Sequence, residues 1–246
     1  MVRANTLEAA RSGRIYRDLP IFQGHRTNYI ATPDIQRPSP QAFLVEQGAN
    51  FDLKAHFHGQ AQFQVVAAGS GFLGAHRIAP FAIHYTSARV PYGPLVAGAE
   101  GVWYFTLRAV TNEGAFPMPE SRGELRRGAK TTQFTVDPPP ISDEAQLRAR
   151  ESVAVEELIA PLADGVAAWI MRVPPNTSAP APVHGSSAGR FYVVAGGEML
   201  IGGKVHPKLA VAWVSADEEP FQVQSSAAGL EVLALQYPED ALTVAA

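Results

Sequence analysis

The sequence contains no cysteine, which excludes disulfide bonds, thiolate metal ligands and cysteine nucleophiles. Only 17% of its 246 residues are charged, and the net charge of −3 includes no basic stripe, so nucleic acid is not an expected partner. No stretch approaches the roughly 18 apolar residues of a membrane span, and the first residues lack the apolar core of a signal peptide. We therefore expect a cytoplasmic protein that contacts neither a membrane nor nucleic acid.

Short apolar runs broken by turn residues follow one another along most of the chain. Strands of this length, separated by glycine and proline, predict an all-β sandwich or barrel. Helix is expected only at residues 1–11, as a packing arm, and at 142–150, where Ser142 would cap the N-terminus. The clearest strand candidates are 41–46, 62–69, 79–85, 102–109, 153–159 and 167–173.

The second half of the chain repeats the first at a shift of 128 residues. The shift places His184 on His56, the segment 190–197 on 62–69, and 230–236 on 102–108. A repeat of this kind indicates two copies of one β-unit. We predict a domain with an arm at 1–120, a linker at 121–150 that includes the proline-rich stretch 137–140, and a second domain at 151–246.

The stretch 56–69 places polar and apolar residues alternately. Side chains alternate between the two faces of a strand, so His56 and His58 point the same way. In an unbroken strand, Gln60, Gln62 and Gln64 would share that face. The opposite face would carry phenylalanine and valine. This pattern predicts a row of polar groups lining a pocket inside a β-barrel.

These residues resemble the cupin superfamily, and the duplication resembles a bicupin. His56, His58, Gln62 and Gly69 fall at the intervals of the first cupin motif, and the segment 91–93 fits the centre of the second. The resemblance implies an all-β fold of two cupin-type jelly-roll β-barrels related by internal duplication. Five positions depart from the first-half motifs: Asn50 and Tyr85 replace glycines, Gln62 replaces the glutamate, Val96 replaces the third histidine, and Glu100 replaces the asparagine.

The resemblance implies one divalent metal (Fe, Zn, Mn or Ni) in the N-terminal barrel. Its ligands would be His56 and His58, with Gln62 assisting, although an amide oxygen is a weaker donor than a carboxylate. His84, Gln60 and Gln64 are the candidates for orienting a substrate or acting in catalysis. Buried histidines that bond to neighbouring strands are the structural alternative for the pair.

The second half carries a different set of candidates. His184 survives, Ser186 replaces the second histidine, and Arg190 takes the position of the glutamate ligand. An arginine there argues against a metal, and Arg190, His184 and Tyr192 could instead bind a carboxylate, which the planar guanidinium matches. An internal salt bridge, to Glu198 or Glu231, is the other interpretation of Arg190.

Three functions remain open at this point. The first is a metal-dependent enzyme of dioxygenase, isomerase or lyase type that acts on a small oxygenated organic molecule. The second is a metal-free binding protein or a structural bicupin whose ligand sites have decayed. The third is metal-free catalysis in which His56 or His58 acts as a general base. The resemblance also implies a homodimer, and the sequence does not identify the substrate.

Overall fold

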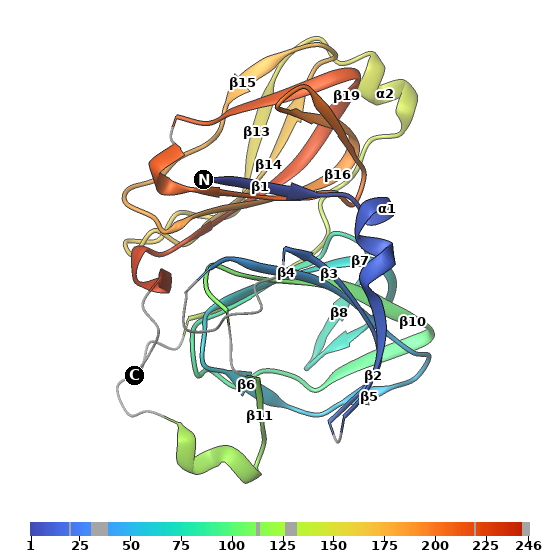
Figure 1. Cartoon of the computed structure of the whole chain (residues 1–246), viewed down its shortest axis with the longest axis vertical. Helices are drawn as coiled ribbons and strands as arrows, with labels where there is room; N and C mark the ends of the chain where they lie inside the picture. The colour runs from blue at the N-terminus through green and yellow to red at the C-terminus, as the bar shows by residue number, and fades with distance from the viewer. Residues whose placement is uncertain (20, 31–38, 112–113, 126–131, 219, 243–246) are drawn as a thin grey trace. The chain divides into compact units, whose positions relative to one another are not determined.

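A computed structural model describes the chain except for residues 20, 31–38, 112–113, 126–131, 219 and 243–246 (Figure 1). The chain forms two compact units, which we call the first barrel (Arg11–Pro138) and the second barrel (Met1–Ala10 with Pro139–Asp240). Each is built on an antiparallel sheet that curls on itself (Figure 1). None of the described helices has both the length and the apolar character needed to cross a membrane.

The first barrel contains a sheet of order β12-β9-β7-β10-β4-β3-β2, in which β5 also pairs with β10 and β8 with β7. The strands β6 and β11 pair separately. Its elements are η1 (Arg11–Gly13), β2 (Arg14–Leu19), β3 (Phe22–Ile30), β4 (Gln41–Gln47), β5 (Asp52–Leu53), β6 (His56–His58), β7 (Gln62–Leu73), β8 (His76–Ile78), β9 (Ile83–Thr86), β10 (Leu95–Arg108), β11 (Ala115–Pro117), η2 (Glu120–Glu124) and β12 (Gln133–Val136).

The second barrel contains a sheet of order β1-β18-β16-β19-β14-β13, with β15 paired to β19 and β17 to β16. Its elements are β1 (Val2–Asn5), α1 (Leu7–Ala10), α2 (Glu144–Arg148), β13 (Ala154–Ile159), β14 (Ala167–Val173), β15 (Ser178–Pro180), β16 (Gly189–Ile201), β17 (Lys204–Pro207), β18 (Val211–Ser215), η3 (Ala216–Glu218) and β19 (Gln222–Tyr237); η4 (Glu239–Leu242) follows β19.

The two sheets have the same strand order, which confirms the predicted duplication. The run β9-β7-β10-β4-β3 of the first barrel corresponds to β18-β16-β19-β14-β13 of the second. The 128-residue shift carries β7 onto β16 and β9 onto β18. The same shift relates Gly69 and Gly197, which both have positive φ and lie so close to a carbonyl of the next strand that no Cβ fits.

The N-terminal segment differs from its prediction. Residues 2–5 form strand β1, which pairs with β18 in the second barrel (Figure 1, where β1 is blue among orange strands), and the α-helix is confined to Leu7–Ala10, followed by the 3-10 turn η1. In the first barrel, β12 pairs with β9, the counterpart of β18. The start of the chain thus fills in the second barrel the position that β12 fills in the first, because an otherwise open sheet edge offers backbone hydrogen bonds there.

The segment predicted as a linker, 121–150, contains elements of both units. Strand β12 belongs to the first barrel and helix α2 to the second, and the division between them falls after Pro138, inside the proline-rich stretch. The N-cap of α2 is Asp143 and not Ser142. The Asp143 side chain accepts a hydrogen bond from the Gln146 backbone, and the Gln146 side chain accepts one from the Asp143 backbone, which is a capping box.

Candidate functional site

The strand register of the first barrel brings polar side chains from four strands, β4, β7, β9 and β10, onto one face. Across the sheet, Phe43 lies opposite Thr106, Thr106 opposite Gln64, and Gln64 opposite His84. Two positions along, Arg108 on β10 lies opposite Gln41 on β4. Directly opposed residues of antiparallel strands project to the same side of the sheet. The rows therefore build one polar inner face.

A cavity of about 630 Å³ opens over this inner face, within the usual range for small-molecule sites. Its charged lining residues are arginines, and no aspartate or glutamate lines it in the part of the chain that the structure describes. Aliphatic and aromatic side chains make up most of the remaining wall. The lining residues are Arg17, Leu19, Ile21, Phe22, Arg26, Gln41, Phe43, Val45, Leu53, His56, His58, Gln64, Tyr92, Tyr104, Thr106, Arg108, Gly114, Ala115 and Pro117.

Arg108 is a buried cation at this cavity, only 4% exposed. Its Nε and Nη2 donate to Gln62 Oε1 at 3.1 and 2.8 Å, and its Nη1 donates to Gln41 Oε1 at 2.9 Å. Its guanidinium carbon lies 5.5 Å from the centroid of the Phe43 ring. These contacts fix the position of a permanent positive charge on the cavity wall.

A directed chain of hydrogen bonds runs from Arg108 to His56. Gln62 accepts from Arg108 through Oε1 and donates through Nε2 to the Tyr92 hydroxyl at 2.7 Å. Nδ1 of His56 lies 2.8 Å from the Lys54 carbonyl, so it carries the proton, and Nε2 accepts from the Tyr92 hydroxyl at 2.9 Å. Burial raises the pKa of Tyr92 to about 12, so the hydroxyl keeps its proton.

The two histidines of β6 are neutral near pH 7. Burial lowers the pKa of His56, and the positive charge of Arg108 lowers it further. Burial also holds the pKa of His58 well below its usual value, with Arg108 and His56 adding to the effect. His58 Nδ1 lies 2.6 Å from the Gly114 carbonyl, and its ring stands perpendicular to that of His56 at 5.1 Å between centroids.

These residues do not fit the divalent metal that the resemblance implies. His56 Nε2 and Gln62 Oε1, two of the three predicted donors, are engaged by Tyr92 and Arg108. The described residues contain no cluster of three or more histidine, aspartate or glutamate side chains suited to a metal ion. A guanidinium bonded to the third predicted ligand would also repel a divalent cation, whereas the cupin motif has a carboxylate at that position.

The three predicted catalytic residues occupy different places. Gln64 lines the cavity, whereas Gln60 is buried in the bend between β6 and β7, where the predicted unbroken strand is interrupted, and is not one of the described lining residues. His84 lies beyond Gln64, at a second void of about 10 Å³. Its Nδ1 contacts Thr135 Oγ1 at 3.0 Å, and burial lowers the pKa of His84 to about 3. Within the described structure, His84 Nε2 and Gln64 Oε1 have no hydrogen-bond partner.

A second arginine, Arg26 on β3, reaches the same cavity. Its guanidinium carbon stacks 3.8 Å from the Phe43 ring centroid, and its Nε donates to Asn28 Oδ1 at 2.9 Å. Burial lowers the pKa of Arg26 to about 10, and the like charge of Arg17 lowers it further. Arg17, on β2, is exposed and lines the cavity as well.

In the second barrel the predicted ligand-binding residues differ in their exposure to solvent. Arg190 and Tyr192 are fully buried, and His184 is exposed. Arg190 Nε donates to Gln236 Oε1 at 3.1 Å, while Gln236 Nε2 donates to the His184 carbonyl at 2.6 Å. Tyr192 packs on Phe221 at 5.2 Å, within a large apolar cluster. Carboxylate binding by these residues stays a prediction.

Each barrel pairs an arginine with a glutamine on equivalent strands, but the two residues have exchanged positions between the barrels. The 128-residue shift places Arg190 on Gln62 and Gln236 on Arg108. In the first barrel the arginine comes from β10 and donates to the glutamine of β7; in the second it comes from β16 and donates to the glutamine of β19. Both barrels therefore place a guanidinium–amide contact where the cupin motif has its metal-binding carboxylate.

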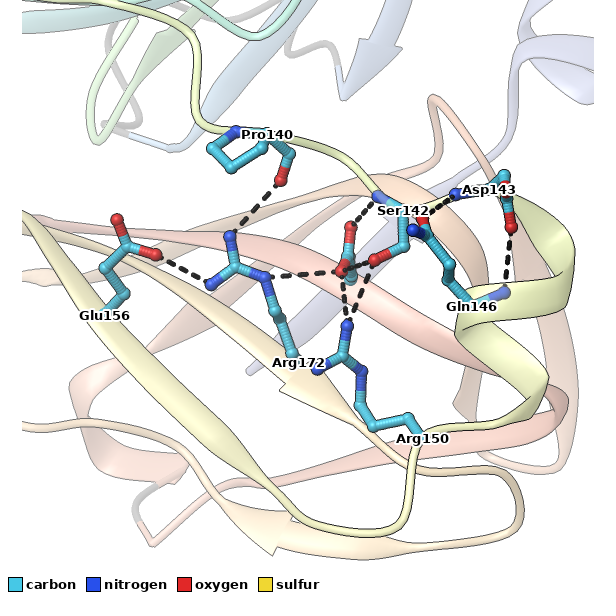
Figure 2. Close-up of polar contacts among 8 residues, drawn as sticks. Pro140, Ser142, Asp143, Gln146, Arg150, Glu156 and Arg172 are labelled. Atoms are coloured by element: carbon cyan, nitrogen blue, oxygen red, sulfur yellow. Dashed lines mark hydrogen bonds and ion pairs between the residues drawn. The ribbon is translucent and has the colours of Figure 1, made fainter.

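Glu231, one of the two carboxylates considered as a partner for Arg190, pairs with other arginines. It is fully buried on β19 and accepts from Arg150 Nη2 at 2.8 Å and from the Ser142 hydroxyl at 2.7 Å. Arg172 Nε approaches it at 3.3 Å. Figure 2 shows the Ser142, Arg150 and Arg172 side chains pointing toward one another around the carboxylate that they share. Glu198, the other candidate, accepts from Ser226. The Glu231 cluster anchors the start of the second unit to its sheet.

Sequence reasoning missed the residues that give the cavity its charge. Arg108 and Arg26 match no position of the cupin motifs. The exchanged residues at 62 and 190 and at 108 and 236 are visible in the repeat. They become a signal only once β7 and β10 are known to be neighbours in the sheet.

Comparison with known proteins identifies the fold. No family model and no curated protein matches the sequence. A bacterial pirin from Escherichia coli in complex with nickel(II) superposes with a TM-score of 0.56 at 10% identity, over 97% of this chain and 99% of that one. A proposed dioxygenase from Nostoc punctiforme gives 0.56 at 12% identity, over 97% and 80% of the two chains.

The Bacillus subtilis oxalate decarboxylase, which has Mn(II) centres, superposes with a TM-score of 0.52 at 12% identity, over 93% of this chain and 76% of that one. At this level of identity the likeness shows the fold and no shared activity. All three are bicupins, and the match extends through both units. The chain therefore has the bicupin fold, with two cupin-type β-barrels related by duplication.

Proposed function

We propose that the first barrel binds a small organic anion and that Arg108 supplies the positive charge that a metal supplies in metal-bearing cupins. The observation that carries this proposal is the composition of the cavity wall. Arg108, Arg26 and Arg17 line it, and no carboxylate does so within the described part of the chain. An anion is the ligand that balances such a wall, because buried positive charge is unfavourable without a compensating negative group.

The details of the wall favour a carboxylate or similar planar acid. Arginine presents parallel N–H groups that match the two oxygens of a carboxylate. The neutral histidines His56 and His58 and the Gln64 amide add polar groups that do not repel an anion. Phe43, Leu53 and Tyr104 provide the apolar surface for the rest of an organic molecule.

The metal-dependent enzyme suggested by the cupin resemblance makes a different requirement. It needs Tyr92 to leave His56 and Arg108 to leave Gln62 before either residue can donate to a metal. Binding measured with and without a chelator separates the two functions. If the barrel binds the anion without a metal, EDTA leaves the affinity for the anion unchanged. If binding depends on a metal, EDTA abolishes it.

The test is calorimetric titration with benzoate, phenylacetate and hexanoate, alongside the neutral analogues benzamide and hexanamide. We expect at least one acid to bind in EDTA and its amide not to bind. Arg108→Gln should weaken binding by about 10- to 100-fold, the usual effect of losing a charged hydrogen bond. Arg14→Gln is the matched control, because Arg14 pairs with Glu46 and does not line the cavity.

Each remaining outcome contradicts the proposal. Binding that needs a divalent ion would indicate the metal-dependent function. An equal loss of affinity in the Arg108 and Arg14 variants would place the anion site elsewhere. A failure of every acid to bind would mean that there is no such site. If Arg108→Gln does not fold, the double variant Gln62→Arg with Arg108→Gln replaces it in the test. This variant restores the pair in the order of the second barrel but moves the guanidinium to position 62, which is not one of the described lining residues, so it should also weaken binding.

A further inference from the structure

Two arginines approach one aromatic ring inside the cavity. Strands β3 and β10 flank β4, which carries Phe43. Arg26 reaches the ring from β3, with its guanidinium carbon 3.8 Å from the centroid, and Arg108 reaches it from β10, at 5.5 Å. Two cationic groups therefore lie within the reach of one small molecule, with an apolar surface between them.

We infer that the ligand of the first barrel carries two acidic groups joined by an apolar body, one acid at Arg108 and the other at Arg26, with the body against Phe43. This inference rests on the proposed anion binding and adds the second acid and the spacer. Each guanidinium is held by side-chain amides: Arg108 by Gln62 and Gln41, and Arg26 by Asn28. Amide side chains orient a guanidinium and carry no charge of their own.

Among the residues that the structure describes, Arg26 has no carboxylate partner of the kind that Arg14 has. Arg14, on the adjacent strand β2, makes a two-point ion pair with Glu46, with N–O distances of 2.8 and 2.7 Å. Within the described structure, the hydrogen-bond partner of Arg26 is Asn28, and the nearby charge is that of Arg17. Burial and like charge both disfavour the ion, and an acidic group of a ligand would offset both.

The cavity wall around the two arginines is mostly apolar. Phe43 lies between them, with Thr106 opposite it on β10, and Val45, Tyr104, Leu53 and Phe22 also line the cavity. A short diacid such as oxalate has no body to cover this surface. A diacid with an aliphatic chain or an aromatic ring would bury apolar area there while keeping both acids at the arginines.

The experiment compares each diacid with the monoacid of the same length. Adipate is paired with hexanoate, suberate with octanoate and terephthalate with benzoate, and oxalate is the short control. We expect the best diacid to bind the parent about 10- to 100-fold more tightly than its monoacid, which exceeds the statistical advantage of two equivalent ends. Arg26→Gln should weaken diacids more than monoacids and so remove this advantage, whereas Arg108→Gln should weaken both classes.

The variants distinguish this inference from the function on which it rests. Diacids that bind no tighter than monoacids, while monoacid binding still depends on Arg108, would overturn the inference and leave the function standing. Equal weakening of diacids and monoacids by Arg26→Gln would overturn it as well, because it places a single acid at Arg26. Failure of every acid to bind would overturn the function itself. Arg14→Gln controls for the lost positive charge, and Arg26→Lys should retain part of the diacid advantage.

Discussion

The exchanged arginine–glutamine pair predicts a strong coupling between positions 62 and 108. Gln62→Arg alone places a second guanidinium against Arg108 inside the barrel. Two like charges about 4 Å apart repel by about 4 kcal/mol at an effective dielectric constant near 20, so this variant should lose that much unfolding free energy. Arg108→Gln alone leaves the carbonyl oxygens of Gln62 and Gln41 without their donor, a loss of about 2–3 kcal/mol.

The double variant restores one arginine and one glutamine in the order that the second barrel already uses. We expect it to lie within about 2 kcal/mol of the parent, so that the double-mutant cycle gives a coupling free energy of at least about 3 kcal/mol. The assay is urea unfolding of the four proteins, followed by tryptophan fluorescence. Effects that add, with a coupling below about 1 kcal/mol, would refute the equivalence of the two pairs.

Further predictions concern stability. Glu231→Gln leaves Arg150 and Arg172 without their shared buried carboxylate and should reduce the unfolding free energy by about 3 kcal/mol. Glu156 is half exposed, so Glu156→Gln should reduce it by less than about 1 kcal/mol. Equal losses in urea unfolding would contradict this prediction. The folded-state pKa of His84, about 3, lies below its unfolded value, so its stabilising contribution is present above pH 6.5 and is lost as pH falls toward 3. From pH 6.5 to 5 the parent should lose about 2 kcal/mol more than His84→Gln; parallel pH profiles would contradict it. Light scattering tests the expected homodimer, and a monomer would contradict it.

The fold was predictable because the same strand pattern occurs in both halves of the sequence. A repeat of alternating strands over residues 62–69 and 190–197 sets both the strand type and the duplication. The assignment of residues 2–5 was not predictable, because a short segment pairs wherever an edge is open, and β18 lies more than 200 residues away in the chain. Local periodicity contains no information about which edge is open.

The site was predictable only in part, for a related reason. Strand parity placed His56, His58 and Gln64 at the cavity, because alternation is a local property. Their hydrogen-bond partners come from other strands: Tyr92 reaches His56, and Arg108 reaches Gln62. Whether a histidine holds a metal or a hydroxyl depends on these cross-strand neighbours, which a motif does not specify.

The most direct test of the proposed anion site is a crystal structure of the protein purified without chelator and grown with 4-bromobenzoate. Anomalous diffraction locates both bromine and any transition metal. The account predicts bromine inside the first barrel, the carboxylate on the Arg108 guanidinium, and no metal peak between His56 and His58. A metal coordinated by the two histidines, or 4-bromobenzoate bound away from Arg108, would contradict it.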